Sequence, residues 1–147
     1  MKYQLIELKP TKVIGMVYRG ANSKGEIPEM WNVFNVRFKD IKNPDLTKFY
    51  GLCYDFSMDG GMAYMAGLGV DTVEEIPNGM EVQEIPGGKY AVFTFTEHIS
   101  KIGAFWDEIY KVGLKENNLE PLNSMTLELY DERFQLNGEC DIYIPVK

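Results

Sequence analysis

Acidic and aromatic side chains recur with the spacing of β-strands near the end of the chain. In LELY (residues 127–130) and DIYI (residues 141–144), two kinds of side chain alternate, and alternate residues of a strand point to opposite faces of a sheet. If the leucine and isoleucine side chains pack on a helix, the remaining four residues share the other face. We expect that face to border a cleft and to carry Glu128, Tyr130, Asp141 and Tyr143.

The chemistry of this group fits a cation. A carboxylate in a partly apolar pocket is unfavourable unless it is paired, and a positively charged ligand would supply the pairing. Aromatic faces would add cation–π attraction of roughly 0.5–2 kcal/mol each. The alternative is that Glu128 and Asp141 lie on a solvated face of the sheet, where the tyrosines cover apolar surface.

Other reactive residues give weaker signals. His98 is the only histidine, so a Ser/His/Asp arrangement is not convincing, and we expect a surface or capping role for it. Cys53 and Cys140 form no CxxC pair, and Cys53 should be an inert thiol on the helix side. No cluster has metal-ligand spacing, so we expect no metal and no cofactor.

The chain also repeats itself. Four segments of the first half match four of the second in the same order, at offsets of 77, 75, 76 and 76 residues. The matched segments are 6–20 with 83–97, 28–38 with 103–114, 50–56 with 126–134, and 65–70 with 141–146. Trp31 falls opposite Trp106, and Tyr54 falls opposite Tyr130. A two-unit repeat describes architecture before it describes function.

Each half reads as strand, strand, helix, strand, strand. Helices are expected at 27–41 and 100–115, because apolar residues recur there at i, i+3, i+4 and i+7; Ser100 is the expected N-cap of the second. Trp31 and Trp106 lie on these apolar stripes, and Trp106 is close enough to the cleft to be a secondary candidate. Strands are expected at 3–8, 12–19, 48–56, 62–70, 80–84, 89–96, 124–133 and 139–146.

This pattern predicts one α+β domain over residues 1–147. Its halves, about 1–73 and 80–147, would be two strand–helix–strand–strand modules related by a pseudo-twofold axis. A central cleft between two such modules is a natural ligand site.

The net charge of the chain limits the classes of partner that it can bind. The chain has 15 Lys plus Arg and 22 Asp plus Glu, a formal net charge of -7. Nucleic-acid binding usually leaves a basic footprint, so we expect no direct DNA binding, and anionic membranes are disfavoured for the same reason. No signal peptide or membrane span is visible. We therefore expect a cytoplasmic protein with reduced thiols.

The repeat, with PGGKYAVFTFTE (86–97), LELYDE (127–132) and CDIYIPVK (140–147), resembles the gyrase-inhibitor-like family over nearly the whole chain. This is the effector-binding domain found in some AraC-type and MerR-type regulators and in free-standing proteins. The resemblance implies a cleft that takes lipophilic, often aromatic, cations. It implies a deep glutamate at Glu128, an acid and an aromatic residue at Asp141 and Tyr143, and further contacts from Trp106, Tyr54 and Tyr64.

Three functions stay open. Binding of a lipophilic, aromatic or cationic small molecule comes first, for sensing or sequestration of a drug or toxin. Hydrolysis of a strained electrophile, with Glu128 as general base and Tyr143 as its partner, is the second. A gyrase-inhibitor-like interaction with a protein partner, or a homodimer, is the third. No helix-turn-helix precedes the first strand at Tyr3, so we expect any regulatory role to need another protein.

Overall fold

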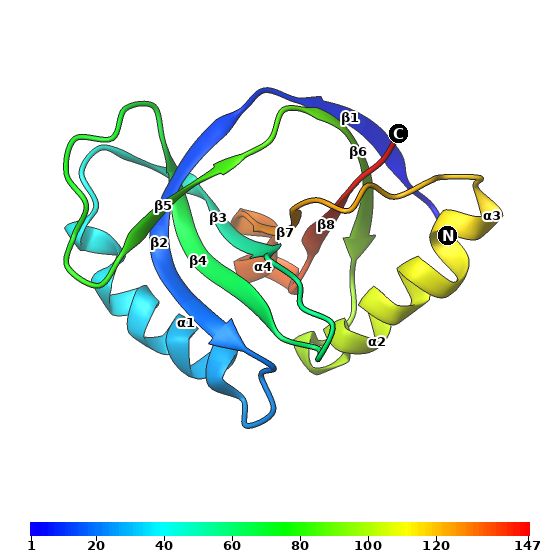
Figure 1. Ribbon diagram of the computed structural model, residues 1–147, viewed down its shortest axis with the longest axis horizontal. Helices are drawn as coiled ribbons and strands as arrows, with labels where there is room; N and C mark the ends of the chain where they lie inside the picture. The colour runs from blue at the N-terminus through cyan, green and yellow to red at the C-terminus, as the bar shows by residue number, and fades with distance from the viewer.

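A computed structural model describes all residues, 1–147, as one eight-stranded antiparallel sheet with helices packed on it. The strands are β1 (Gln4–Leu8), β2 (Thr11–Gly20), β3 (Pro44–Tyr54), β4 (Met62–Val70), β5 (Glu81–Ile85), β6 (Gly88–Phe95), β7 (Thr126–Tyr130) and β8 (Cys140–Pro145). The sheet curls into a half-barrel, and the two main helical segments pack on the same face of it, one toward each end of the strand order (Figure 1).

The first helical segment is α1 (Glu26–Arg37), extended by the 3-10 turn η1 (Phe38–Asp40). The second runs without a break through η2 (Ile99–Lys101), α2 (Ile102–Glu108), the π-helical turn η3 (Ile109–Gly113) and α3 (Leu114–Glu116). A short helix, α4 (Glu132–Asn137), connects β7 to β8. None of these helices is long and apolar enough to span a membrane.

The strand order is β1-β6-β8-β7-β3-β4-β2-β5. The counterparts in the two halves are β1 and β5, β2 and β6, β3 and β7, and β4 and β8. When every strand is replaced by its counterpart, the same order is obtained, read from the other end. The two halves join where β3 pairs with β7. The first strand of each half forms the edge of the other half's part of the sheet, because β1 pairs with β6 and β5 pairs with β2. This order supports two related modules. Superposition of the halves with Trp31 on Trp106 stays a prediction. The match of Tyr54 with Tyr130 is wrong, because Tyr54 shares the buried cluster of Leu127 on one face of the sheet, whereas Tyr130 lies three residues from Leu127 and points to the other face.

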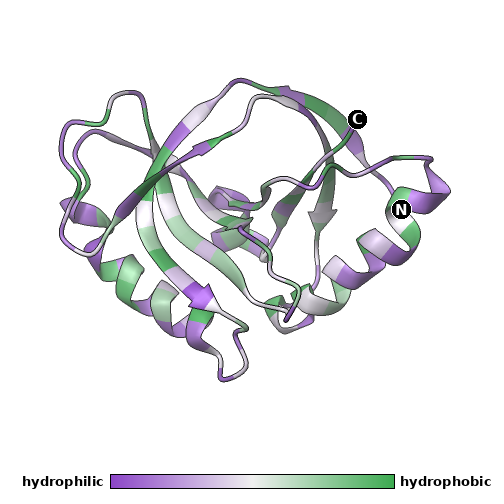
Figure 2. Cartoon of the chain, viewed as in Figure 1, coloured by the Kyte–Doolittle hydropathy of each residue, from purple (hydrophilic) through white to green (hydrophobic).

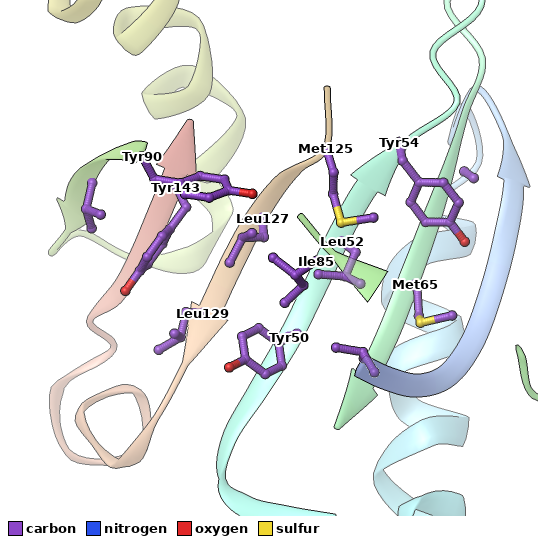
Figure 3. Close-up of a cluster of buried hydrophobic side chains, with 13 residues drawn as sticks. Tyr50, Leu52, Tyr54, Met65, Ile85, Tyr90, Met125, Leu127, Leu129 and Tyr143 are labelled. Atoms are coloured by element: carbon purple, nitrogen blue, oxygen red, sulfur yellow. The ribbon is translucent and has the colours of Figure 1, made fainter. Parts of the chain in front are cut away.

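Three larger apolar clusters and a fourth of three buried residues (Ile27, Cys53 and Tyr64) hold the sheet and helices together. The inner face of the curled sheet carries thirteen buried residues, among them Leu52, Met65, Leu127 and Tyr143 (Figure 3). On the other face, which we call the helix face, one cluster packs under α1 and another under the second helical segment. Figure 2 shows hydrophobic stretches along the central strands and mixed hydropathy along α1.

Two local predictions were wrong. Ser100 does not cap the second helix; the side chain of His98 accepts a hydrogen bond from the Ser100 N–H and caps the 3-10 turn η2. The strand expected at 124–133 ends at Tyr130, and α4 follows it. Asp131 caps α4 by accepting from the Arg133 N–H, and Gly138 ends it at a φ of 78°. Asp at the N-cap and Gly after the last turn are ordinary helix signals.

Candidate functional site

A cavity of about 1600 Å³ lies on the helix face, between the two helical segments. Residues of α1 line one side and residues of η2, α2 and η3 line the other. Strands β3, β4 and β7 contribute from the sheet, and α4 contributes Glu132, Arg133, Phe134 and Gln135. The cleft is therefore on the face that also carries the helices, and not on the opposite face as expected.

Glu128 is the buried acid of this cavity, with 7% of its surface exposed. Its carboxylate accepts hydrogen bonds from the Tyr64 hydroxyl at 2.7 Å, from Trp106 Nε1 at 2.9 Å and from the Tyr130 hydroxyl at 3.0 Å. None of the ion pairs in the chain includes it. Glu128 thus has hydrogen-bond donors around it but no cationic partner.

These contacts connect both helical segments through the sheet. Trp31 of α1 donates from Nε1 to the Tyr64 hydroxyl at 2.9 Å, and that hydroxyl donates to Glu128. Trp106 of α2 donates to the second carboxylate oxygen of Glu128. A continuous run of hydrogen bonds therefore crosses the cavity from one helix to the other.

The tyrosines beside Glu128 are held neutral. Burial, with a further contribution from the Glu128 charge, raises the pKa of Tyr64 and of Tyr130 well above 10.0. Burial likewise raises the pKa of the Cys53 thiol, which lines the cavity. Both tyrosines therefore remain hydrogen-bond donors at neutral pH, and Cys53 remains a thiol with little nucleophilic character.

Aromatic rings stand on both sides of Glu128. Trp31 meets Tyr130 edge-on, with centroids 5.6 Å apart, and Tyr130 meets Phe134 in the same way at 4.9 Å. On the α2 side, Trp106 and Tyr110 stack with centroids 6.5 Å apart and an interplanar angle of 14°. The cavity therefore presents ring faces and edges around one carboxylate.

The structure separates the four residues expected to share a face. In the register of β7 and β8, Glu128 pairs with Ile142 and Leu127 pairs with Tyr143. Directly paired residues lie on one face, so Tyr143 belongs to the inner face, where it packs edge-on to Tyr90 (Figure 3). The prediction was wrong because alternation within each strand does not determine the register between two strands, and a one-residue offset reverses the faces.

Asp141 and Tyr54 also lie apart from Glu128. Asp141 forms an ion pair with Arg133 at 2.6 Å and accepts from the Thr94 hydroxyl at 2.7 Å. Tyr54 is buried in the inner-face cluster. Of the seven expected ligand contacts, the cavity brings together Glu128, Tyr130, Trp106 and Tyr64. The expected catalytic pair of Glu128 and Tyr143 is split between the two faces.

Sequence reasoning missed five aromatic residues that line the cavity: Trp31, Phe49, Phe56, Tyr110 and Phe134. A signal for Trp31 was present, because the repeat matches it to Trp106, which was already a candidate. Tyr110 follows Trp106 by four residues, which places both on one side of a helix. No group of three or more His, Cys, Asp or Glu side chains in the chain could hold a metal ion.

Comparisons with known proteins agree with this fold. The transcriptional regulator BrlR of Pseudomonas aeruginosa is 32% identical over 99% of this chain and 56% of its own length. The chain spans about half the length of the curated relatives it matches. Among solved structures, SAV2435 bound to tetraphenylphosphonium superposes with a TM-score of 0.79 at 23% identity, covering 100% of this chain and 94% of that one.

An integron cassette protein of Vibrio cholerae superposes with a TM-score of 0.64 at 19% identity, over 99% of this chain and 95% of its own. The family described as Cass2, integron-associated effector binding protein, matches residues 4–146. That match covers nearly the whole sequence and agrees with the gyrase-inhibitor-like resemblance of its motifs. The chain belongs to the Cass2 family of integron-associated effector-binding proteins, a gyrase-inhibitor-like small-molecule-binding domain.

Proposed function

We propose that this domain binds a lipophilic, aromatic cation in the cavity between its helices, against Glu128. One observation carries the proposal: Glu128 is a buried carboxylate with three hydrogen-bond donors and no cationic partner, among aromatic rings. The three donors stabilise the charged carboxylate, and the charge stays available to a ligand.

The physical terms favour a cation over a neutral ligand of equal shape. Two opposite charges attract far more strongly in a site with little water than on an open surface. Ring faces such as those of Trp106 and Tyr110 add cation–π attraction. A solved relative of the same fold, SAV2435, carries tetraphenylphosphonium, which supports a permanent organic cation as the first probe.

Hydrolysis receives no comparable support. The expected partner of Glu128, Tyr143, lies on the inner face. The tyrosine hydroxyls that do reach Glu128, those of Tyr64 and Tyr130, donate to it and have a raised pKa. We therefore propose binding without turnover.

The test removes the charge of the Glu128 side chain with little change in its shape. Glu128→Gln should weaken tetraphenylphosphonium binding by roughly tenfold or more, since a charge pair in a desolvated site contributes on the order of 1.5 kcal/mol or more. The affinity for triphenylphosphine oxide, a neutral molecule with similar rings, should fall much less. Calorimetry with both ligands measures the difference.

Glu132→Gln is the matched control. Glu132 also lines the cavity but is exposed, so water screens its charge and the same substitution should change the affinity little. Equal weakening of the cation and the neutral ligand by Glu128→Gln would contradict a charge-based role. Equal effects of Glu128→Gln and Glu132→Gln would place the decisive charge outside the buried site.

A further inference from the structure

Gly51 lies in β3, the strand between Tyr64 and Glu128. It pairs with Glu128 of β7 on one side and with Ala66 of β4 on the other. Tyr64 pairs instead with Cys53, two residues along β3. The Tyr64 side chain therefore reaches Glu128 diagonally, across β3 and over Gly51.

A side chain at position 51 would lie between the two hydrogen-bonding groups. A Cβ added to Gly51 would stand 2.1 Å from the Tyr64 hydroxyl and 2.8 Å from Glu128 Oε1. Both distances are shorter than a real Cβ contact. Every residue other than glycine would thus collide with the donor and the acceptor of the same hydrogen bond.

The backbone itself does not demand glycine here. Gly51 is not among the residues with positive φ, and glycine inside a strand ordinarily weakens it. Glycines in strand interiors often mark a place where another group approaches closely. At Gly51 that group is the Tyr64 hydroxyl.

We propose that Gly51 is a positioning residue of the cation site: its missing side chain allows Tyr64 to donate across β3 to Glu128. The connection to cation affinity rests on the proposed function, whereas the geometric role of Gly51 does not. Through Tyr64 the effect extends to α1, because the Tyr64 hydroxyl is also the acceptor of Trp31 Nε1.

Gly51→Ala should separate Tyr64 from Glu128. The carboxylate would lose its shortest hydrogen bond, 2.7 Å long, and Trp31 would lose its acceptor. Because a hydrogen bond to a charged group is among the stronger ones, tetraphenylphosphonium affinity should fall by roughly tenfold. Calorimetry on the full chain measures this loss.

Gly69→Ala is the matched control. Gly69 lies in β4, next to β3, and a Cβ there would meet nothing closer than 3.6 Å. The same substitution, also in a central strand, should therefore leave tetraphenylphosphonium affinity and melting temperature near those of the natural chain. A loss as large as that of Gly51→Ala would show a general effect of alanine in the sheet and overturn the proposal.

An NMR readout separates positioning from mere destabilisation. The chain has two tryptophans, so its nitrogen–proton spectrum contains two indole signals, which Trp31→Phe assigns. Gly51→Ala should shift the Trp31 indole signal, and Gly69→Ala should not. An unshifted Trp31 signal in Gly51→Ala would overturn the proposal. If tetraphenylphosphonium does not bind even the natural chain, the proposed function fails, and this signal still decides the role of Gly51.

A second variant decides the matter if Gly51→Ala does not fold. Tyr64→Ala removes the ring that comes nearest to the new methyl group and opens space into which the end of the Glu128 side chain can turn, so the double variant should fold. In that background, Gly51→Ala should change tetraphenylphosphonium affinity by less than about twofold, because residues that act through each other are not additive. A double variant that is as unstable as Gly51→Ala alone would show that the collision lies elsewhere, and would overturn the proposal.

Discussion

At the scale of single residues, the site depends on how Glu128 is surrounded. Strand alternation identified Glu128 as an acid facing a cleft, and the resemblance pointed to the same residue. Its actual neighbours, Tyr64 from β4 and Trp106 from α2, come from elements that no local pattern brings together. Their convergence depends on tertiary packing, so the sequence could name candidates but not their contacts.

The buried tyrosines should make the folded protein less stable at alkaline pH. Because the pKa of Tyr64 and Tyr130 is raised well above 10.0 in the folded chain, these groups ionise first in the unfolded chain. The folded state then holds more protons than the unfolded state, so the stability present below pH 10 decreases as the pH rises above it. Urea unfolding between about pH 8 and about pH 11 should show this decrease.

Two variants identify the residues behind the alkaline decrease. It should become shallower in Tyr64→Phe and in Tyr130→Phe, since neither phenylalanine can ionise. Tyr18→Phe is the comparison, because the Tyr18 hydroxyl bonds to Glu26 and not to Glu128. A stability that stays constant to about pH 11 would rule out the raised pKa values.

At the scale of elements, the sequence predicted the strands and the two main helices to within a few residues, because apolar periodicity is strong there. It failed where two elements meet. The pairing of Leu127 with Tyr143 reversed the expected face of β8 relative to β7. The helix α4 was missed because its six residues are too few for a periodic pattern to stand out.

The attachment of α4 to β8 is testable. Arg133 of α4 pairs with Asp141 at 2.6 Å and with its own N-cap residue, Asp131, at 2.9 Å. The Arg133 side chain is about a third exposed, at 35%, so Arg133→Gln should cost about 1 kcal/mol of unfolding free energy, reduced by salt. Urea unfolding at low and high salt measures this cost.

The same substitution should also weaken tetraphenylphosphonium binding, because α4 lines the cavity and Phe134 packs on Tyr130. Arg19→Gln is the control: Arg19 makes two 2.9 Å hydrogen bonds to Glu81, and both side chains are exposed. Neither Arg19 nor Glu81 lines the cavity, so the affinity should not change. Unchanged affinity in Arg133→Gln would show that α4 does not shape the site.

At the scale of the whole molecule, the internal repeat was the strongest sequence signal. It predicted eight strands and two main helices with a cleft between the halves, and the cavity does lie between the two helical segments. The repeat could not predict the pairing of β3 with β7. That pairing joins two segments far apart in the sequence, and it depends on how the two halves pack together. For that reason the cleft was assigned to the wrong face.

The charge of the whole molecule sets the expectation for DNA. With a net charge of -7, the chain should repel phosphates, and the purified chain should not bind duplex DNA at physiological salt. Fluorescence anisotropy with labelled duplexes is the measurement, and a repeat at low salt detects weak nonspecific association. Sequence-specific binding that survives physiological salt would contradict this prediction.

The exchange of edge strands makes the two halves mutually dependent. Since β1 completes the sheet of the second half and β5 that of the first, a cut in the segment between β4 and β5 would leave each fragment with a strand whose partner lies in the other. Such fragments would complement one another and reassemble, as two separately encoded polypeptides could. Splitting the gene at this point, or fusing two genes there, would conserve the architecture. A dimer of two identical half-length subunits could become a single chain in the same way. The two halves could then diverge in sequence, as they have at the cavity, where the lining acids Glu128, Asp131 and Glu132 all come from the second half.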